Sequence, residues 1–226
     1  MARRVLLNYF TEVIDSFLFY GYTFPHIVTM NLYPVFLKLQ DKSCLIIGGG
    51  NVAARKVQDI LQAGGRVTLI APEITGDLRK LADAGTIRYK SRKYLRGDVK
   101  KHFLVIAATN LPGVNREIAR EAEKYGVLLN AVDNPENCNF FVPASIKRGM
   151  LQIAVSTSGT APLFAREMRE YLEKKIPPGI AEALEEVEVE RKHIISTETD
   201  PGKKQVKMDK IIKPMVLDII RGLDRQ

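Results

Sequence analysis

A glycine-rich turn at residues 48–53 carries the clearest chemical signal in the chain. It follows an apolar stretch and has the pattern Gly48-x-Gly50-x-x-Ala53. Gly48 lets the chain turn off a strand, Gly50 leaves room for a diphosphate to approach the backbone, and Ala53 lets a helix pack closely on the strand. The free N–H groups at the start of that helix attract phosphate charge. The spacing therefore predicts a dinucleotide site.

An acidic residue follows the next expected strand. Glu73 lies 23 residues after Gly50, close to the spacing at which an acid hydrogen-bonds the adenosine ribose. No basic residue stands at this strand end to meet a 2′-phosphate, so the sequence favours NAD over NADP. The alternative interpretation makes Glu73 an acid near the N-terminus of a helix expected at 75–84.

Two polar residues follow later strands, where open α/β sheets bind their ligands. Asp133 stands at the end of a strand expected at 127–132, and its carboxylate is suited to take or give a proton beside a hydride acceptor. A turn-forming role before Asn134-Pro135 is the alternative. Thr109 follows a strand expected at 103–108 and either touches the cofactor or caps the next helix.

A run of small and hydroxyl residues precedes a helix expected at 162–175. Hydroxyls and backbone N–H groups at a helix start suit an anionic substrate, and a plain capping loop is the alternative. Lys147, Arg148 and Arg166 flank the run, either as carboxylate ligands or as solvated surface charges. The run consists of Ser156, Thr157, Ser158, Gly159 and Thr160.

The apolar periodicity predicts the elements that position these residues. Strands are expected at 43–47, 66–70, 87–90, 103–108 and 127–132, alternating with helices at 52–63, 75–84 and 115–125. This order indicates an α/β fold with a Rossmann-type, doubly wound and mostly parallel sheet. Residues 33–39 are expected to form an edge strand or an extended entry segment; Pro34 cannot donate a ladder hydrogen bond, which suits an edge.

The pattern changes after Pro143. A strand is expected at 151–155, perhaps in another sheet, followed by helices at 162–175, 180–195 and 209–222 with a polar loop at 197–205. At the other end of the chain, residues 1–29 are rich in Phe and Tyr. Prolines and polar residues interrupt the uncharged run there, so neither a membrane span nor a signal peptide is expected. We interpret residues 1–29 as an extension outside the fold.

The chain carries a net charge of +8 over 226 residues, with basic and acidic residues interspersed. This favours a small polyanionic ligand over nucleic acid, which requires clustered cations or stacking aromatic residues. Cys44 and Cys138 form no disulfide framework, and the three histidines lie far apart. We therefore expect no metal site and a cytoplasmic location.

Five motifs, in order, then resemble one family. Tyr33–Leu37 with Cys44–Lys56 is the first, and the others are Ile106–Asn110, Asn130–Asp133, Phe140–Ala144 and Ala154–Pro162. Together they resemble the dehydrogenase module of siroheme synthases, and in particular the stand-alone precorrin-2 dehydrogenases. The resemblance extends from about Tyr33 to Lys175.

The resemblance implies an NAD-dependent oxidation of precorrin-2 to sirohydrochlorin in siroheme biosynthesis. It implies that Asp133 is the key acid–base residue and that the cofactor contacts are Asn51, Val52, Pro72 and Glu73. It further implies a homodimer whose subunit has an NAD-binding Rossmann domain (30–142), a dimerisation segment (143–176) and a small helical domain (177–226). The tetrapyrrole substrate carries many carboxylates, which suits the positive net charge.

Two other functions stay open at this point. Some members of the family also insert ferrous iron, so a bifunctional dehydrogenase and ferrochelatase is one alternative. A non-enzymatic NAD-sensing module is the other, because Rossmann folds also serve as regulatory binders. Asp133 and the 156–160 run favour an enzyme, since a sensor needs neither.

Overall fold

The computed structural model describes residues 31–132 and 134–224. The chain divides into two compact units, residues 1–34 and 35–226, and the extension expected at 1–29 lies outside the described residues. Of the two interpretations of residues 33–39, the edge strand is wrong and the extended entry segment remains: residues 31–39 have no ladder partner among the described residues, and Tyr33 and Phe36 are 87% and 68% exposed. An apolar run alone does not make a strand, because a strand needs a neighbour for its backbone hydrogen bonds.

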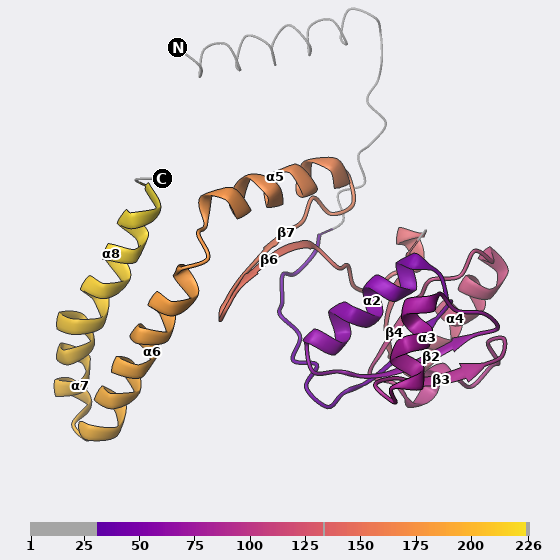
Figure 1. The fold of residues 1–226 in the computed structure, drawn as a ribbon, viewed down its shortest axis with the longest axis horizontal. Coiled ribbons are helices and arrows are strands. Elements are labelled where there is room, and N and C mark those ends of the chain that lie inside the picture. The colour runs from indigo at the N-terminus through magenta and orange to yellow at the C-terminus, as the bar shows by residue number, and fades with distance from the viewer. Residues whose placement is uncertain (1–30, 133, 225–226) are drawn as a thin grey trace, which may run out of the picture. The chain divides into compact units, whose positions relative to one another are not determined.

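A five-stranded parallel sheet forms the first part of the larger unit (Figure 1). Its strand order is β3-β2-β1-β4-β5, the order of a Rossmann half with two further strands. All five strands occur within a residue or two of their expected positions. Their bounds are β1 Ser43–Ile47, β2 Arg66–Ala71, β3 Arg88–Ser91, β4 Leu104–Ala107 and β5 Leu128–Ala131.

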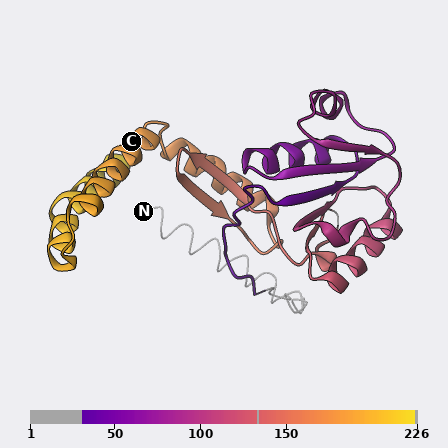
Figure 2. The same cartoon turned by 90° about the horizontal axis from the view of Figure 1, so that it is seen from below.

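Alternate side chains of each strand enter two different core clusters. Cys44 and Ile46 of β1 pack in one cluster, and Leu45 and Ile47 pack in the other, all nearly inaccessible to solvent. The first cluster includes residues of helices α2 (Asn51–Gln62) and α3 (Gly76–Asp83), and the second includes residues of α4 (Pro112–Tyr125). The sheet is therefore covered by helices on both faces (Figure 2), which explains its continuous apolar strands.

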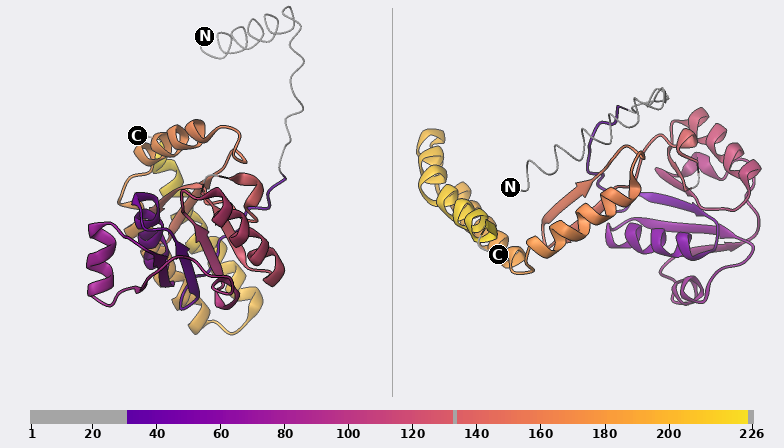
Figure 3. Two further views of the ribbon diagram at one scale, coloured as in Figure 1. Left: turned by 90° about the vertical axis from the view of Figure 1, so that its right-hand side faces the viewer. Right: turned by 90° about the horizontal axis from the view of Figure 1, so that it is seen from above.

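A separate two-stranded antiparallel sheet follows. It consists of β6 (Ala144–Arg148) and β7 (Leu151–Val155), joined by a turn in which Gly149 has a φ of 56°. The sequence predicts β7 but not β6. Helix α5 (Pro162–Lys175) packs against both strands (Figure 3, right).

The remaining chain is helical. Helix α6 (Ile180–Thr197) packs against a π-helical turn, η3 (Met208–Ile212), and against α8 (Lys213–Asp224). The polar loop expected at 197–205 is partly wrong, because α7 spans Pro201–Lys207. The Asp200 side chain caps this helix by accepting a hydrogen bond of 2.8 Å from the Lys203 N–H, and Pro201 occupies its first position. Two short 3-10 turns complete the elements, η1 at Val99–Lys101 and η2 at Pro135–Asn137.

Candidate functional site

A cavity of about 660 Å³ lies at the carboxyl ends of the parallel strands. Its walls come from the turns after β1, β2 and β4 and from the chain after β3. This is the edge at which open α/β sheets bind ligands. The structure brings all seven cofactor residues expected from the sequence to this cavity: Gly48, Gly50, Asn51, Val52, Pro72, Glu73 and Thr109.

Three consecutive glycines line the cavity, and they differ in the space around them. Gly48 has a φ of 122°, and a Cβ there would lie 2.1 Å from the Ala108 carbonyl oxygen. A Cβ on Gly49 would lie 1.9 Å from the Glu73 carbonyl oxygen. Gly50 has nothing within 4 Å of its Cβ position. The first two glycines therefore serve packing within the protein, whereas Gly50 borders open space.

The open space at Gly50 fits a dinucleotide diphosphate. Gly50 is the N-cap residue of α2, with φ −84° and ψ −172°, and no side chain caps this helix start. The first N–H groups of a helix have no partner within it. They form an anion site here, with no Cβ in the way of an approaching phosphate. The residues present thus suit a nicotinamide dinucleotide at its phosphates.

Gly49 is a residue that the sequence reasoning missed. The pattern Gly48-x-Gly50 leaves it as an unrestricted position, yet its carbonyl accepts a hydrogen bond of 3.0 Å from the Thr75 N–H. The close approach of the Glu73 backbone ties the turn after β1 to the turn after β2. Only the run of three glycines hinted at this role.

Glu73 is exposed at the end of β2 and lines the cavity. The N-cap of the following helix is Thr75, and the acid in that helix's first turn is Asp77. Among the described residues, the Glu73 carboxylate has no hydrogen-bond or ion-pair partner. It is therefore available to a ligand in the cavity, and the helix start has another acid.

Thr109 lines the cavity and also takes part in a hydrogen-bond network at the start of α4. Its hydroxyl lies 2.6 Å from Asn115 Oδ1 and accepts a hydrogen bond of 3.2 Å from the Leu111 N–H. The Asn115 side chain is 6% exposed and donates back to the Thr109 carbonyl at 3.0 Å. This network fixes the start of α4 while Thr109 lines the cavity.

A loop after β3 supplies two cavity residues that the sequence did not reveal, Lys93 and Tyr94. Arg92 closes the base of the loop with two hydrogen bonds of 2.7 Å to Asp98. The buried Glu121 of α4 accepts from the Tyr94 hydroxyl and from the Gly97 N–H. These contacts join residues far apart in sequence, so no local pattern could have shown them.

Burial, hydrogen bonds and charge shift the pKa values of Asp98 and Tyr94. Burial acts to raise the pKa of Asp98, but the hydrogen bond and charge of Arg92 outweigh it and hold that pKa below its ordinary value. Burial raises the pKa of Tyr94, and the hydrogen bond to Glu121 raises it further. Tyr94 therefore remains a neutral hydrogen-bond donor at the cavity wall.

Asp133 lies outside the described residues, but its neighbours are described. Val132 lines the cavity and donates its N–H to the Ala107 carbonyl of β4 at 3.0 Å. Asn134 caps η2, its side chain accepting a hydrogen bond of 3.0 Å from the Glu136 N–H. The chain thus leaves the cavity wall at Val132 and enters a capped turn at Asn134.

The 156–160 run forms the loop between β7 and α5 and does not line the cavity described above. Thr157 Oγ1 accepts from the Ala161 N–H at 3.2 Å, and Ser158 N–H donates to Ser156 Oγ at 3.2 Å. Ser158 and Gly159 both have positive φ, 53° and 80°. Hydrogen bonds within the loop and from the Ala161 N–H therefore hold it in this conformation.

The three cations near that run differ in their partners. Arg148 pairs with Glu173 at 3.4 Å, and Arg166 pairs with Glu167 at 3.1 Å. Lys147 has no ion-pair partner among residues 31–132 and 134–224.

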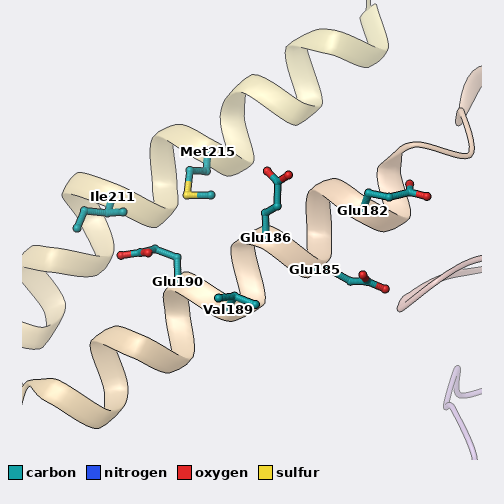
Figure 4. A pocket seen from close by; sticks show the side chains of 7 residues that line it. All are labelled: Glu182, Glu185, Glu186, Val189, Glu190, Ile211 and Met215. Atoms are coloured by element: carbon teal, nitrogen blue, oxygen red, sulfur yellow. The ribbon is translucent and has the colours of Figure 1, made fainter.

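A second cavity, of about 590 Å³, lies between α6 and the helical segment formed by η3 and α8, which contribute Ile211 and Met215. Glu186 and Glu190 project from α6 toward this facing helix (Figure 4). Glu182 and Glu185 add further carboxylates to its lining. A wall of four carboxylates repels an anionic ligand, so this cavity does not suit a dinucleotide or a polycarboxylate.

Two searches of the described part of the chain gave no candidates. No group of three or more His, Cys, Asp or Glu residues is placed to hold a metal ion in residues 31–132 and 134–224. None of the helices described is both long and apolar enough to cross a membrane.

Comparison with known proteins gives two family models that match this chain. One is described as putative NAD(P)-binding and matches residues 35–144, and the other as sirohaem biosynthesis protein central and matches residues 148–175. The siroheme synthase of Methylobacillus flagellatus is 42% identical over 148 residues, which is 66% of this chain and 32% of that protein. The siroheme synthase of Methylococcus capsulatus is 43% identical over 148 residues, 66% of this chain and 31% of that protein.

The chain thus spans about a third of the length of these curated relatives. Among solved structures, one titled SirC, precorrin-2 dehydrogenase, aligns with a TM-score of 0.71 and 25% identity. This alignment covers 86% of the present chain and 100% of the other. The chain therefore belongs to the family of the NAD(P)-binding modules of siroheme synthases and precorrin-2 dehydrogenases.

Proposed function

We propose that this protein is an NAD-dependent dehydrogenase that oxidises precorrin-2 to sirohydrochlorin. The observation that carries the proposal is the alignment over the full length of the precorrin-2 dehydrogenase structure. The cavity at the strand ends supports it, because the open space at Gly50 fits a dinucleotide diphosphate. The net charge of +8 suits a polycarboxylate substrate.

The reaction removes a hydride and a proton from the substrate. NAD accepts the hydride when it is bound. We assign the proton to the carboxylate of Asp133, which follows the cavity residue Val132 in the chain. The helix start at Gly50 holds the diphosphate.

The choice of NAD over NADP belongs to this proposal. Glu73 lines the cavity with no partner among the described residues, so its carboxylate can accept hydrogen bonds from a ribose. The same charge repels a 2′-phosphate. Lys93 also lines the cavity, but no ion pair joins it to Glu73 in the part of the chain that the structure describes.

We further propose a cytoplasmic homodimer with the three regions 30–142, 143–176 and 177–226. The two-stranded β6–β7 sheet supports the dimer, because within the described residues neither outer edge has a strand partner. Leu163, Phe164 and Tyr171 of α5 are each more than half exposed and add apolar surface. Two free thiols, Cys44 and Cys138, are consistent with a reducing compartment.

The direct test is turnover of precorrin-2. The full chain is incubated anaerobically with precorrin-2 and NAD, and the absorbance of NADH and of sirohydrochlorin is followed. Stoichiometric formation of both supports the proposal, and no NAD-dependent product overturns it. Adding ferrous ion to sirohydrochlorin in a separate reaction tests the chelatase alternative.

The role of Asp133 is tested by Asp133→Asn. We expect turnover to fall by about 10² while NAD affinity is unchanged, the usual scale for a positioned acid–base group. Glu136→Gln is the matched control, because it removes another carboxylate from the same loop; Glu136 lines a different cavity. Wild-type turnover in Asp133→Asn would show that this residue forms a turn and does not transfer the proton.

A further inference from the structure

The loop between β3 and η1, residues 92–98, is closed by its own ion pair. Arg92 makes two hydrogen bonds of 2.7 Å to Asp98, which join the first residue of the loop to the last. The Asp98 carboxylate also accepts from the Leu95 N–H at 2.9 Å, and the Asp98 N–H donates to the Leu95 carbonyl at 3.1 Å. These bonds fix the shape of the loop, but none of them attaches it to α4.

Glu121 of α4 makes that attachment. The residue is 6% exposed, and a buried carboxylate is costly unless its oxygens have hydrogen-bond partners. One oxygen accepts from the Tyr94 hydroxyl, and the other accepts from the Gly97 N–H at 2.7 Å. Both donors belong to the loop 92–98, so this buried acid ties the loop to the helix.

The same loop forms part of the wall of the cavity at the strand ends. Tyr94 lines this cavity together with Pro72 and Glu73, which follow β2, and β3 lies beside β2 in the sheet. In this fold the acid after the second strand meets the adenosine ribose, so the β2 side takes the adenosine half of a dinucleotide. Adenine has a flat aromatic face, and such a base stacks on aromatic side chains.

We propose that Glu121 is a positioning residue for the cofactor. By accepting from the Tyr94 hydroxyl and the Gly97 N–H, it holds the loop 92–98 in place before the cofactor binds, and Tyr94 then contacts the adenosine half of NAD. The inference rests on the proposed function only in taking NAD as the cofactor. Its structural part stands on the two hydrogen bonds of Glu121 and on the lining of the cavity.

A wall that is already held in place favours binding. Ordering a mobile side chain when a ligand binds costs free energy, and fixing the binding surface beforehand removes that cost. The Tyr94 hydroxyl can serve this purpose at neutral pH, because burial and the hydrogen bond to Glu121 both raise its pKa and keep its proton in place. Loss of the Glu121 carboxylate should therefore weaken cofactor binding, although Glu121 is not among the cavity-lining residues.

The first test measures how the free protein holds the loop, by amide hydrogen exchange. In Glu121→Ala the Gly97 amide loses its partner and should exchange about tenfold faster than in the wild type. The Leu95 amide should exchange within about twofold of the wild-type rate, because Asp98 still accepts from it. Unchanged exchange at Gly97 would refute the anchoring role of Glu121, whatever the affinity for NAD.

The second test measures NAD binding by titration calorimetry. We expect Glu121→Ala to raise the Kd about tenfold, and Tyr94→Phe, which removes only the hydroxyl, to raise it about fivefold. Glu121→Gln keeps an acceptor oxygen and should recover part of the loss. Adding Tyr94→Phe to Glu121→Ala should cause no further rise, because the hydroxyl has already lost its partner. A further fivefold rise would show that Glu121 does not act through Tyr94.

Matched controls remove the same chemical groups elsewhere on α4. Tyr125→Phe removes another tyrosine hydroxyl, and Glu123→Gln neutralises an exposed carboxylate; neither residue lines the cavity. Both controls should bind NAD with a Kd within about twofold of the wild type. A purely structural role for Glu121 would instead give a folded Glu121→Ala chain of lower thermal stability and wild-type Kd, and that result would overturn the proposal.

The contact with the adenosine half is tested with ADP-ribose, which lacks the nicotinamide. Tyr94→Ala should raise the Kd for NAD and the Kd for ADP-ribose by the same factor, about tenfold. A rise for NAD alone would show that Tyr94 meets the nicotinamide half and not the adenosine half.

These outcomes separate the inference from the proposed function. A wild-type chain that binds NAD but does not oxidise precorrin-2 refutes the proposed function, and the NAD titrations still decide the role of Glu121. A wild-type chain that binds neither NAD nor ADP-ribose refutes the inference as well, whatever the exchange at Gly97.

Discussion

Replacing Gly50 by aspartate tests whether the glycine turn holds a diphosphate. A Cβ at this position meets no atom of the protein within 4 Å, and φ −84° with ψ −172° suits any residue. Aspartate is also a preferred N-cap residue, and its charge interacts favourably with a helix N-terminus. We therefore expect Gly50→Asp to unfold with a free energy at or up to about 1 kcal/mol above that of the wild type.

The effect on the ligand is opposite in sign. A diphosphate brings two negative charges to this helix start. With the carboxylate about 5 Å away, each charge costs about 0.8 kcal/mol in water and about 3 kcal/mol at an effective dielectric constant of about 20. The two together weaken NAD binding by about 2 to 6 kcal/mol, which is a rise in Kd of about 30-fold or more.

Titration calorimetry with NAD measures the Kd, and thermal unfolding measures the stability. Gly50→Asn is the matched control, because asparagine has nearly the same shape and no charge. Gly50→Asn should weaken NAD binding only through the bulk of its side chain, without the charge repulsion. If Gly50→Asp binds NAD with a Kd within about twofold of the wild type, the diphosphate does not lie at this turn, and the reasoning from the open space is refuted.

Three further predictions concern neighbouring features of the same cavity. Gly49→Ala should lower the free energy of unfolding by about 2 to 4 kcal/mol, measured by denaturant titration. The added methyl group would overpack against the Glu73 carbonyl and strain the hydrogen bond from the Thr75 N–H. Wild-type stability would show that Gly49 does not join the turn after β1 to the turn after β2. Asp98 has a pKa held below its unfolded value of about 3.9, so its stabilisation is present above that pH and is lost as pH falls through the lower, folded pKa. The thermal unfolding midpoint of Asp98→Asn should therefore be lower than that of the wild type at pH 7, and the two midpoints should converge at acid pH. An equal difference between the midpoints at neutral and acid pH would contradict this. Glu73→Gln should lower the ratio of the NADP dissociation constant to the NAD dissociation constant by about tenfold. An unchanged ratio would show that Glu73 does not contact the ribose.

Local patterns in the sequence were enough to predict the parallel sheet and seven of the residues that line the cavity. The central strands β1, β2 and β4 are largely apolar and buried on both faces, and each is followed by a turn that lines the cavity. Residues that immediately follow a strand, such as Gly50 and Thr109, could therefore be placed from sequence alone. Glu73 could be placed in the same way, after β2.

Residues brought together by contacts distant in sequence could not be predicted. Tyr94 reaches the cavity because Glu121, 27 residues later, accepts from its hydroxyl. Gly49 is restricted by the backbone of Glu73, which belongs to a different turn. Neither relation leaves a periodic signal in the chain.

The edge strand considered for residues 33–39 and the loop expected at 197–205 fail for different physical reasons. Residues 33–39 have the composition of a strand, but their backbone finds no ladder partner. Residues 201–207 begin with Pro-Gly, which is typical of a turn, yet Pro201 suits the first position of a helix and Asp200 caps it. A capping residue before proline therefore outweighed the turn signal.

The two edges of the parallel sheet are protected from the addition of another strand in different ways, and this affects aggregation at high protein concentration. On β3 the exposed residues Arg88 and Lys90 place positive charge along the free edge, which repels another copy. On β5 the side chains of Cys138 and Asn139 already occupy the backbone groups that an added strand would need. The sheet is thus closed to strand addition at both ends, by charge at one and by occupancy at the other. Loss of the Asn139 side chain should therefore favour aggregation through the β5 edge. Aggregation through the β3 edge would instead require the loss of the charges of Arg88 and Lys90.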